Sequence, residues 1–495
     1  MTSGGGLKLL KTLETEQEVY IRKLVVAISP SGVFLQKISH LVDYVMYTDY
    51  REPTFNLPED LFWWILVTWY QLEMHLCDGQ CIRRMLFICD VGVINMTSDG
   101  RVKLMKVIDR ETVVRVEKMI VAISPTGQFL QTISPFIDSI TYGNYHEPTF
   151  LVPEGNTITE INFMRATSLR AFIAGSNTGL EILNIQYSEL DRLPKALPKL
   201  DRLKELNIQY GMLSVLRLDM LMENQNLTTL DLSHNQIRQI FPVTAYPGTM
   251  LSIEKLILNG NLLERLDMAV FAPMSKLDFF QVLENRLTQL DASIPTTFAK
   301  LSTLNIGDNK IRTVDLRNLT LPSLLSVSFG PNNLKQMPAL PKMLPALEYM
   351  SLAQNNLTQL DLGYFRQYQK LKYVYIMSNQ ITAVRTSSPV KLSILWLNLA
   401  TNKITSFNIT GCGLPNMTSL NLRGNRLTVV PPVFARFPKL SVTLDMNPIT
   451  CDTLLLYKDQ IKNDKLYKDR VSPSWACDTT SSFLVGEQIK ICCDS

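Results

Sequence analysis

The sequence has few of the residues and patterns on which catalysis usually depends. Only four of its 495 residues are histidines, and none belongs to a G-x-S-x-G or H-E-x-x-H motif. The G-x-x-x-x-G-K loop that cradles phosphates is also missing. These absences predict that the protein is not an enzyme and carries neither a cofactor nor a metal ion.

Concentrated charge and long hydrophobic runs are missing as well. The net charge is +4, and we find no run of five like charges and no basic stripe with interleaved aromatic residues. The apolar run at 61–69 falls far short of the ~20 residues that span a bilayer. We therefore expect no nucleic-acid partner and no membrane span.

A repeated pattern fills the middle of the chain. It reads L-x-x-L-x-L-x-x-N-x-L, most clearly between Leu227 and Ile237, and its period is 22 to 26 residues. This is the signature of leucine-rich repeats. Residues 158–447 should form a solenoid of about 13 repeats, an α/β fold with a curved parallel β-sheet on its concave face. Function should then lie mainly on a surface. The repeats begin at residues 158, 180, 203, 227, 253, 277, 301, 324, 347, 371, 394, 417 and 439.

Asparagine occupies the ninth position of ten consecutive repeats. A side chain that turns inward at the end of a strand is costly to bury unless its amide bonds to backbone groups, so we interpret these residues as a structural ladder. The first three repeats have Ala166, Ser188 and Gly211 at this position. The ladder consists of Asn235, Asn261, Asn285, Asn309, Asn332, Asn355, Asn379, Asn402, Asn425 and Asn447.

Seven of the eight cysteines lie outside the repeats, as in disulfide-linked caps. We predict a cap at 77–157, a disulfide-rich cap at 448–495 and an oxidising compartment. Zinc is the alternative for His75, Cys77, Cys81 and Cys89, although their spacing fits no common zinc motif. Cys412 is a possible free or intermolecular thiol. The disulfide candidates are Cys77, Cys81, Cys89, Cys451, Cys477, Cys492 and Cys493.

The sequence also holds six Asn-x-Ser/Thr sequons, which are consistent with secretion. The glycosylation candidates are Asn95, Asn226, Asn318, Asn356, Asn408 and Asn416.

The amino-terminal part contains a duplication. Residues 22–60 reappear as 117–155 with 21 of 39 positions identical, and only the second copy continues into repeats. The apolar segment 61–76 has the length of a signal-peptide core. We interpret residues 1–60 as an orphan segment from a fusion or a gene-model artefact, and a genuinely duplicated cap is the alternative. We expect the secreted protein to begin between about Tyr70 and Leu76.

The carboxy-terminal cap carries the most specific pattern. Asn447-Pro448 closes the last repeat, Cys451 begins a helix-like stretch, and Cys477 precedes the adjacent pair Cys492-Cys493. This order resembles the cap of the mosquito leucine-rich-repeat immune proteins over residues 156–495. The resemblance implies secretion into hemolymph, innate immunity, and partners among other leucine-rich-repeat immune proteins or complement-like thioester proteins. No heptads follow the cysteine pair, so the resemblance is to a coil-less member.

Aromatic residues recur at outward strand positions of neighbouring repeats. Tyr349, Tyr373 and Trp396 share the third position, and Tyr375 follows two residues after Tyr373. Such side chains are enriched at binding hot spots, so we predict a concave ligand-binding patch, although they could instead only shield the sheet. Tyr187 and Tyr210 form a weaker pair at the eighth position.

Two functions remain open from the sequence. The favoured one is an extracellular recognition protein that binds a protein partner or a microbial surface through its concave face. The alternative is an intracellular scaffold that assembles cytosolic partners. Counting free thiols distinguishes them, because a cytosolic scaffold keeps most cysteines reduced.

Overall fold

The computed structural model describes residues 18–21, 44–47, 83–85, 88–95, 113–120, 130–131, 134–135, 138–176, 179–244, 248, 250–477, 479, 481–486 and 489–494. The chain divides into two compact units. The first comprises Met1–Ala122 and Phe136–Thr141, and the second comprises Ile123–Pro135 and Tyr142–Ser495. The segment 61–76, Cys77 and Cys81 lie outside the described residues.

The described strands of the first unit pair in two places. β1 (Glu18–Ile21) lies parallel to β2 (Tyr44–Tyr47). β3 (Arg83–Met85) is antiparallel to β4 (Ile88–Asn95), which in turn is parallel to β5 (Val113–Ile120). The interpretation of residues 1–60 as an orphan segment stays a prediction.

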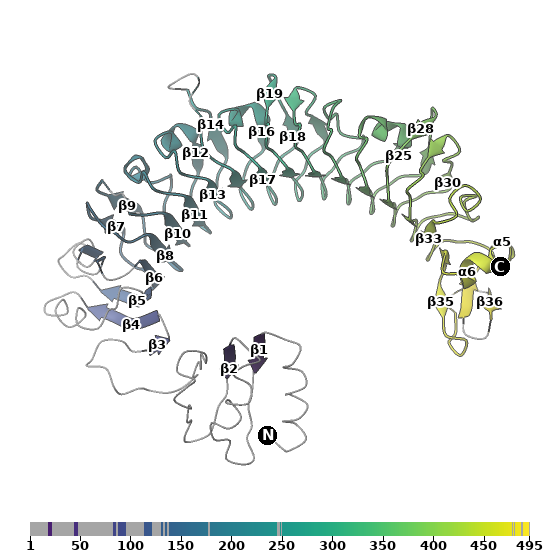
Figure 1. Ribbon diagram of the computed structural model, residues 1–495, viewed down its shortest axis with the longest axis horizontal. Coiled ribbons are helices and arrows are strands. Elements are labelled where there is room, and N and C mark those ends of the chain that lie inside the picture. The colour runs from purple at the N-terminus through teal and green to yellow at the C-terminus, as the bar shows by residue number, and fades with distance from the viewer. Residues whose placement is uncertain are drawn as a thin grey trace, which may run out of the picture. The chain divides into compact units, whose positions relative to one another are not determined.

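One continuous parallel sheet runs through the second unit, as predicted, and it follows the inner side of the arc in Figure 1. Its described strands pair in chain order, each with the next. In sequence they are β8 (Glu160–Phe163), β10 (Ile182–Gln186), β11 (Glu205–Gln209), β13 (Thr229–Asp231), β15 (Lys255–Ile257), β17 (Phe279–Gln281), β20 (Thr303–Asn305), β23 (Ser326–Ser328), β24 (Tyr349–Ser351), β26 (Tyr373–Tyr375), β29 (Trp396–Asn398), β32 (Ser419–Asn421), β33 (Ser441–Thr443) and β34 (Leu466–Tyr467).

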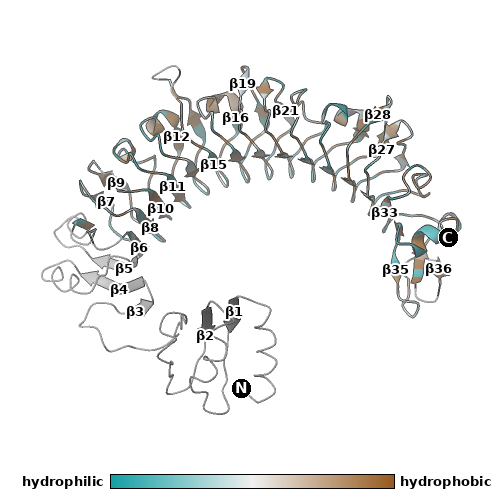
Figure 2. Ribbon diagram, viewed as in Figure 1, coloured by the Kyte–Doolittle hydropathy of each residue, from teal (hydrophilic) through white to brown (hydrophobic). Residues whose placement is uncertain are grey.

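The strands alternate between buried and outward residues, and this alternation builds the core. Leu230, Leu256, Phe280 and Leu304 are partners in four adjacent strands, and each is 0% exposed. Figure 2 shows hydrophobic and hydrophilic residues mixed within the turns. One turn could not bury its apolar face alone, so stacking about 14 turns provides the hydrophobic stabilisation.

The outer side of the second unit carries short parallel strands and 3-10 helices. A step of 22 to 26 residues leaves little length for a helix between successive inner strands. Within the described turns of the solenoid, successive inner strands are joined without an α-helix, and α5 and α6 lie in the carboxy-terminal cap described below. The outer strands are β7 (Thr149–Val152) with β9 (Ala171–Ala174), β12 (Val215–Arg217) with β14 (Gln239–Phe241), β16 (Arg265–Asp267) with β18 (Gln289–Asp291) and β21 (Thr313–Asp315), β19 (Thr296–Thr297) with β22 (Leu319–Thr320), β25 (Gln359–Asp361) with β27 (Ala383–Arg385) and β30 (Ser406–Phe407), and β28 (Val390–Lys391) with β31 (Cys412–Gly413).

Among the described residues, four 3-10 helices also lie on this outer side. They are η2 (Leu197–Lys199), η3 (Leu218–Leu221), η4 (Met268–Phe271) and η5 (Leu362–Gln367). Asp267 caps η4 by accepting a hydrogen bond from Ala269 N, and Asp361 caps η5 by accepting one from Gly363 N.

The asparagine at position nine joins each turn to its neighbours. Nδ2 of Asn355 donates to the carbonyl oxygens of Phe329 at 3.1 Å and Leu352 at 3.2 Å, and its Oδ1 accepts from Leu334 N at 2.9 Å. The same arrangement recurs along the ladder through Asn447. In the early turns Ser188 substitutes for asparagine, and its buried Oγ has no partner. The ladder therefore pairs backbone groups that would otherwise be buried without partners.

Large apolar side chains are buried at both ends of the described solenoid. At the start, rings of Tyr142, Phe150 and Phe163 pack with centroids 4.8 to 5.3 Å apart. At the end, β34 adds the last strand of the sheet, and Leu466 is fully buried. The cap also contains α5 (Cys451–Leu455), α6 (Lys458–Lys462), β35 (Arg470–Val471), β36 (Ser481–Val485) and β37 (Ile489–Cys493).

Two disulfides fasten this carboxy-terminal cap, as predicted. Cys451 bonds Cys493 and Cys477 bonds Cys492, so the adjacent cysteines have different partners. The disulfides join α5 and the loop at 472–477 to β37. Of the described cysteine side chains, Cys412 alone is a free thiol.

Candidate binding surface on the concave face

The inner sheet brings the four predicted aromatic residues together. Tyr349, Tyr373 and Trp396 are partners in the strands β24, β26 and β29, and Tyr375 lies beside Ser351 and Asn398. Tyr373 is 37% exposed and Trp396 is 41% exposed, whereas the intervening core residues are buried. We call Tyr349, Tyr373, Tyr375 and Trp396 the aromatic cluster. Its side chains stand outward because core and surface residues alternate along each strand.

The rings of the cluster differ in their contacts with other aromatic rings. Tyr349 and Tyr375 contact each other, with centroids 5.1 Å apart and planes tilted by 36°. Burial, together with the neighbouring Tyr375, raises the pKa of Tyr349 above its ordinary value despite a hydrogen bond with Ser351. Tyr373 and Trp396 make no ring contact with any described aromatic side chain. Both side chains are also partly exposed to solvent, so a ligand can reach them.

The outward strand positions around the cluster carry no formal charge. From β17 to β33, both outward positions of every inner strand are occupied by uncharged residues. The nearest ion pair, Lys372 with Glu348 at 2.9 Å, lies just before the strands begin. Charged residues are depleted at the centres of binding interfaces, and this surface shares that property.

A second aromatic group lies where the inner strands turn. Tyr187 stacks on Tyr210 with centroids 5.0 Å apart, and Tyr210 stacks on His234 at 4.5 Å. All three residues have a left-handed backbone, and a Cβ on Gly260 in the next turn would lie only 2.3 Å from Nδ1 of His234. We call Tyr187, Tyr210 and His234 the aromatic column. The rings of this column stack face to face on one another, whereas those of Tyr373 and Trp396 stack on no described aromatic ring.

The sequence reasoning missed part of both surfaces. It did not single out His234, although its shared eighth position with Tyr187 and Tyr210 is the signal for stacking. It also missed an amide row at the fifth position: Asn207 donates to Asn184, which donates to Asn162, each at 2.5 Å. Three asparagines at one position of successive turns could have indicated this row.

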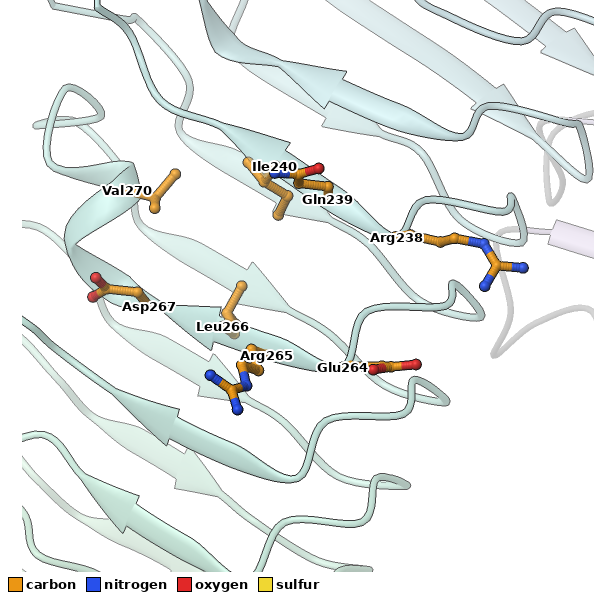
Figure 3. Close-up of a pocket in the computed structure, with 8 residues that line it drawn as sticks. All are labelled: Arg238, Gln239, Ile240, Glu264, Arg265, Leu266, Asp267 and Val270. Carbon is orange, nitrogen blue, oxygen red and sulfur yellow. The ribbon is translucent and has the colours of Figure 1, made fainter.

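The outer side contains an open hollow of about 350 Å³ between β14 and β16. Figure 3 shows Ile240, Leu266 and Val270 around it, with Arg238 and Glu264 at one end. Asp267 at the other end is already used as a helix cap. Burial would raise the pKa of Asp267, but hydrogen bonds from Ser293 and Ala269 outweigh this effect and lower it. The hollow thus offers no nucleophile paired with a base.

The carboxyl of Asp291, on a neighbouring outer strand, has a pKa shifted in the opposite direction to that of Asp267. Asp291 lies between Asp267 and Asp315 in register. Burial first, and then repulsion from Asp267, raises the pKa of the Asp291 carboxyl. Among the residues that the structure describes, no group of three or more His, Cys, Asp and Glu side chains could hold a metal ion.

The remaining predicted sites have the following positions. Cys412 is fully buried on β31, which leaves no surface sulfur for bonding to another chain. The sequon residues Asn226, Asn318, Asn408 and Asn416 are exposed, and Asn356 is half-buried. The side chains of Cys89 and Asn95 lie outside the described part. No helix in the described ranges is long and apolar enough to cross a membrane.

Comparison with known proteins agrees with this architecture. The family described as "Leucine rich repeat" matches residues 178–237 and 369–427. No curated protein matches the chain. A leucine-rich-repeat protein of Leptospira interrogans is similar in structure, with 18% identity, a TM-score of 0.51 and coverage of 93% of this chain and 97% of that one. This likeness shows the fold.

Two further solved structures are more distant. The mosquito LRIM1/APL1C complex has 15% identity, a TM-score of 0.48 and coverage of 82% of this chain and 69% of that one. An internalin of Listeria monocytogenes has 19% identity, a TM-score of 0.39 and coverage of 65% and 86%. The repeat period, the stacked parallel sheet and the family match agree, and the chain has a leucine-rich-repeat solenoid fold.

Proposed function

We propose that this chain is an extracellular recognition protein of innate immunity, which binds a protein partner or a microbial surface through its concave face. The aromatic cluster is the observation that carries the proposal. Four large amphipathic side chains meet on a hydrogen-bonded sheet, where little conformational entropy is lost on binding. The leucine-rich-repeat fold itself is typical of proteins that bind other proteins.

The cap disulfides support an extracellular location. Two disulfides close a cap of about 45 residues, and such bonds persist in oxidising compartments. An intracellular scaffold would keep these four thiols reduced, so the disulfides weigh against that alternative. We accordingly propose secretion into hemolymph, in line with the resemblance of the cap to the mosquito immune proteins.

The sequons support a glycoprotein whose concave face stays open. None of Asn226, Asn318, Asn356, Asn408 and Asn416 occupies an outward position of an inner strand. Glycans at these residues would cover other parts of the solenoid and leave the aromatic cluster uncovered. This distribution fits a protein that binds through its inner sheet.

Partners are proposed from the cap resemblance and the surface together. Candidates are other leucine-rich-repeat immune proteins and complement-like thioester proteins. A purified thioester protein and cultured bacterial cells serve as the two probes. Replacing Tyr373 and Trp396 with Ala should weaken binding to one of them by about 2 kcal/mol, because truncating a central aromatic anchor commonly costs that much.

Stability measurements provide the control for this test. The double variant should keep the unfolding midpoint of the wild type, since Val374 and Leu397 beneath the cluster remain buried. A matched variant, Y187A/Y210A, alters similarly exposed tyrosines of the aromatic column and should bind normally. Binding that survives in Y373A/W396A would refute the concave site.

A further inference from the structure

We propose that the aromatic cluster recognises an uncharged saccharide, such as a neutral glycan chain on a microbial surface. This inference rests on the proposed function and specifies the ligand class for the same surface. Three observations point to it: two exposed aromatic side chains, amide donors held in place beside them, and outward strand positions without charge.

The exposed aromatic rings of Tyr373 and Trp396 suit the shape of a sugar ring. One face of a hexose presents several C–H groups with partial positive charge, and the face of an aromatic ring is negative. Tyr373 and Trp396 are side-by-side partners in β26 and β29, and neither ring stacks on a described aromatic side chain. Two consecutive sugar rings could therefore stack on two consecutive side chains.

Asparagines beside the cluster are fixed as donors. Oδ1 of Asn398 accepts from Ala400 N at 3.1 Å, and Oδ1 of Asn421 accepts from Arg423 N at 3.0 Å. These bonds hold each carboxamide with its oxygen toward the backbone, so the Nδ2 groups remain free to donate. Asn398 is the partner of Tyr375, and Asn421 is the partner of Asn398. Hydroxyl groups of a saccharide can accept from both amides while its rings stack alongside.

The absence of charge at the outward strand positions favours uncharged saccharides over anionic ones. Sulfated or carboxylated glycans are usually held by Arg or Lys, and neither occupies an outward strand position from β17 to β33. Ser326, Ser328 and Ser419 lie in strands that flank the aromatic residues and add hydroxyl groups. An uncharged polyhydroxylated chain matches this set of donors and acceptors.

Retention of the full-length protein on insoluble polysaccharides tests the inference. The probes are cellulose, chitin and curdlan, which are uncharged, and carboxymethyl-cellulose is the charged counterpart of cellulose. Wild type should be retained on at least one uncharged polymer more strongly than on carboxymethyl-cellulose. Raising the salt to about 1 M should leave this retention unchanged, because salt screens charge and not stacking.

Variants then assign the retention to the cluster. Y373A/W396A should lose at least about 10-fold in affinity for the retained polymer. Y373F/W396F keeps the aromatic faces and should retain most of the affinity, and Y187A/Y210A should behave like wild type. Should the double alanine variant lose the cooperative unfolding of wild type, the single variants Y373A and W396A must each weaken retention.

Two outcomes would overturn the inference: no uncharged polymer retains the wild type, or retention persists in the alanine variants. The partner experiment separates this failure from that of the proposed function. A thioester protein that binds wild type but not Y373A/W396A, with no polysaccharide retained, would refute the saccharide and leave concave recognition standing. If Y373A/W396A kept both polysaccharide retention and binding of the thioester protein, the saccharide inference and the concave binding site would both be refuted.

Discussion

At the scale of single residues, position eight and position nine act together in most repeats. Position eight adopts a left-handed backbone even where the residue is not glycine, as at His234, Gln354 and Thr401, whereas Pro331 is an exception. This conformation costs energy for residues with a Cβ. It turns the following asparagine inward, where the hydrogen bonds of its amide offset that cost. The strained backbone at position eight and the asparagine hydrogen bonds at position nine therefore belong to the same turn.

The ladder gives a prediction at Asn332. Its Nδ2 donates to Ile306 O at 2.8 Å and Phe329 O at 2.9 Å, and its Oδ1 accepts from Ile311 N at 2.8 Å. N332A should lower the free energy of unfolding by about 2–4 kcal/mol, because buried backbone groups lose their partners. Urea unfolding of N333A is the control: this exposed neighbour should cost less than about 0.5 kcal/mol. Equal effects of the two variants would contradict a structural ladder.

The buried thiol of Cys412 gives a prediction about pH. Burial raises the pKa of Cys412 to about 11, although the nearby Arg436 guanidinium opposes the shift. The folded protein therefore holds this proton more tightly than the unfolded chain does. The associated stability is fully present below pH about 9 and is lost as pH rises toward 11.

Alkylation and unfolding measure this effect. Iodoacetamide at pH 8 should modify Cys412 only after unfolding, which peptide mass spectrometry detects. Between pH 8 and pH 10.5, C412A should lose less stability than wild type. Rapid labelling of Cys412 in the native protein would show instead that the thiol is accessible.

At the scale of elements, the inner and outer sides of the solenoid differ in continuity. Inner strands pair without a break from β8 to β34, which fixes their spacing at about 4.8 Å. Outer strands form separate small groups, such as β12 with β14 and β16 with β18 and β21. Each break allows neighbouring turns to spread on the outer side, and this difference curves the solenoid.

The terminal cap gives a prediction at the same scale. The Cys477–Cys492 disulfide closes a sequence separation of 15 residues, and the Cys451–Cys493 disulfide closes one of 42. In the chain-entropy account, removing the first should cost about 3 kcal/mol and removing the second about 4 kcal/mol. C477S/C492S and C451S/C493S should therefore show decreasing stability and secreted yield in that order. Cap thiols that are all alkylated in the native wild type would contradict this prediction.

At the scale of the whole chain, each described turn of the second unit contacts mainly its neighbours, as in other stacked repeats. A substitution on the concave surface should therefore have a local effect. This property makes the aromatic cluster a testable site, because Tyr373 and Trp396 can be changed while the core residues beneath them remain. It also explains why a cap is needed: the last turn would otherwise expose its core.

The repeat period by itself determined the solenoid, the inner parallel sheet and the residues of its core. A period-two alternation such as Leu256 and Leu258 fixes which side chains are buried, and stacking in register follows from equal turns. The same regularity placed Tyr349, Tyr373 and Trp396 side by side, since partners across a parallel sheet share a repeat position.

Tertiary structure alone decided the features that depend on distance and orientation between turns. The disulfide pairing could not be read from the sequence, because four cysteines allow three connectivities and the fold of the cap selects one. Stacking of His234 on Tyr210, the burial of Cys412 and the exposure of Tyr373 and Trp396 likewise depend on side-chain packing. Sequence specifies which residues share a position, whereas packing specifies which of their surfaces remain free to bind.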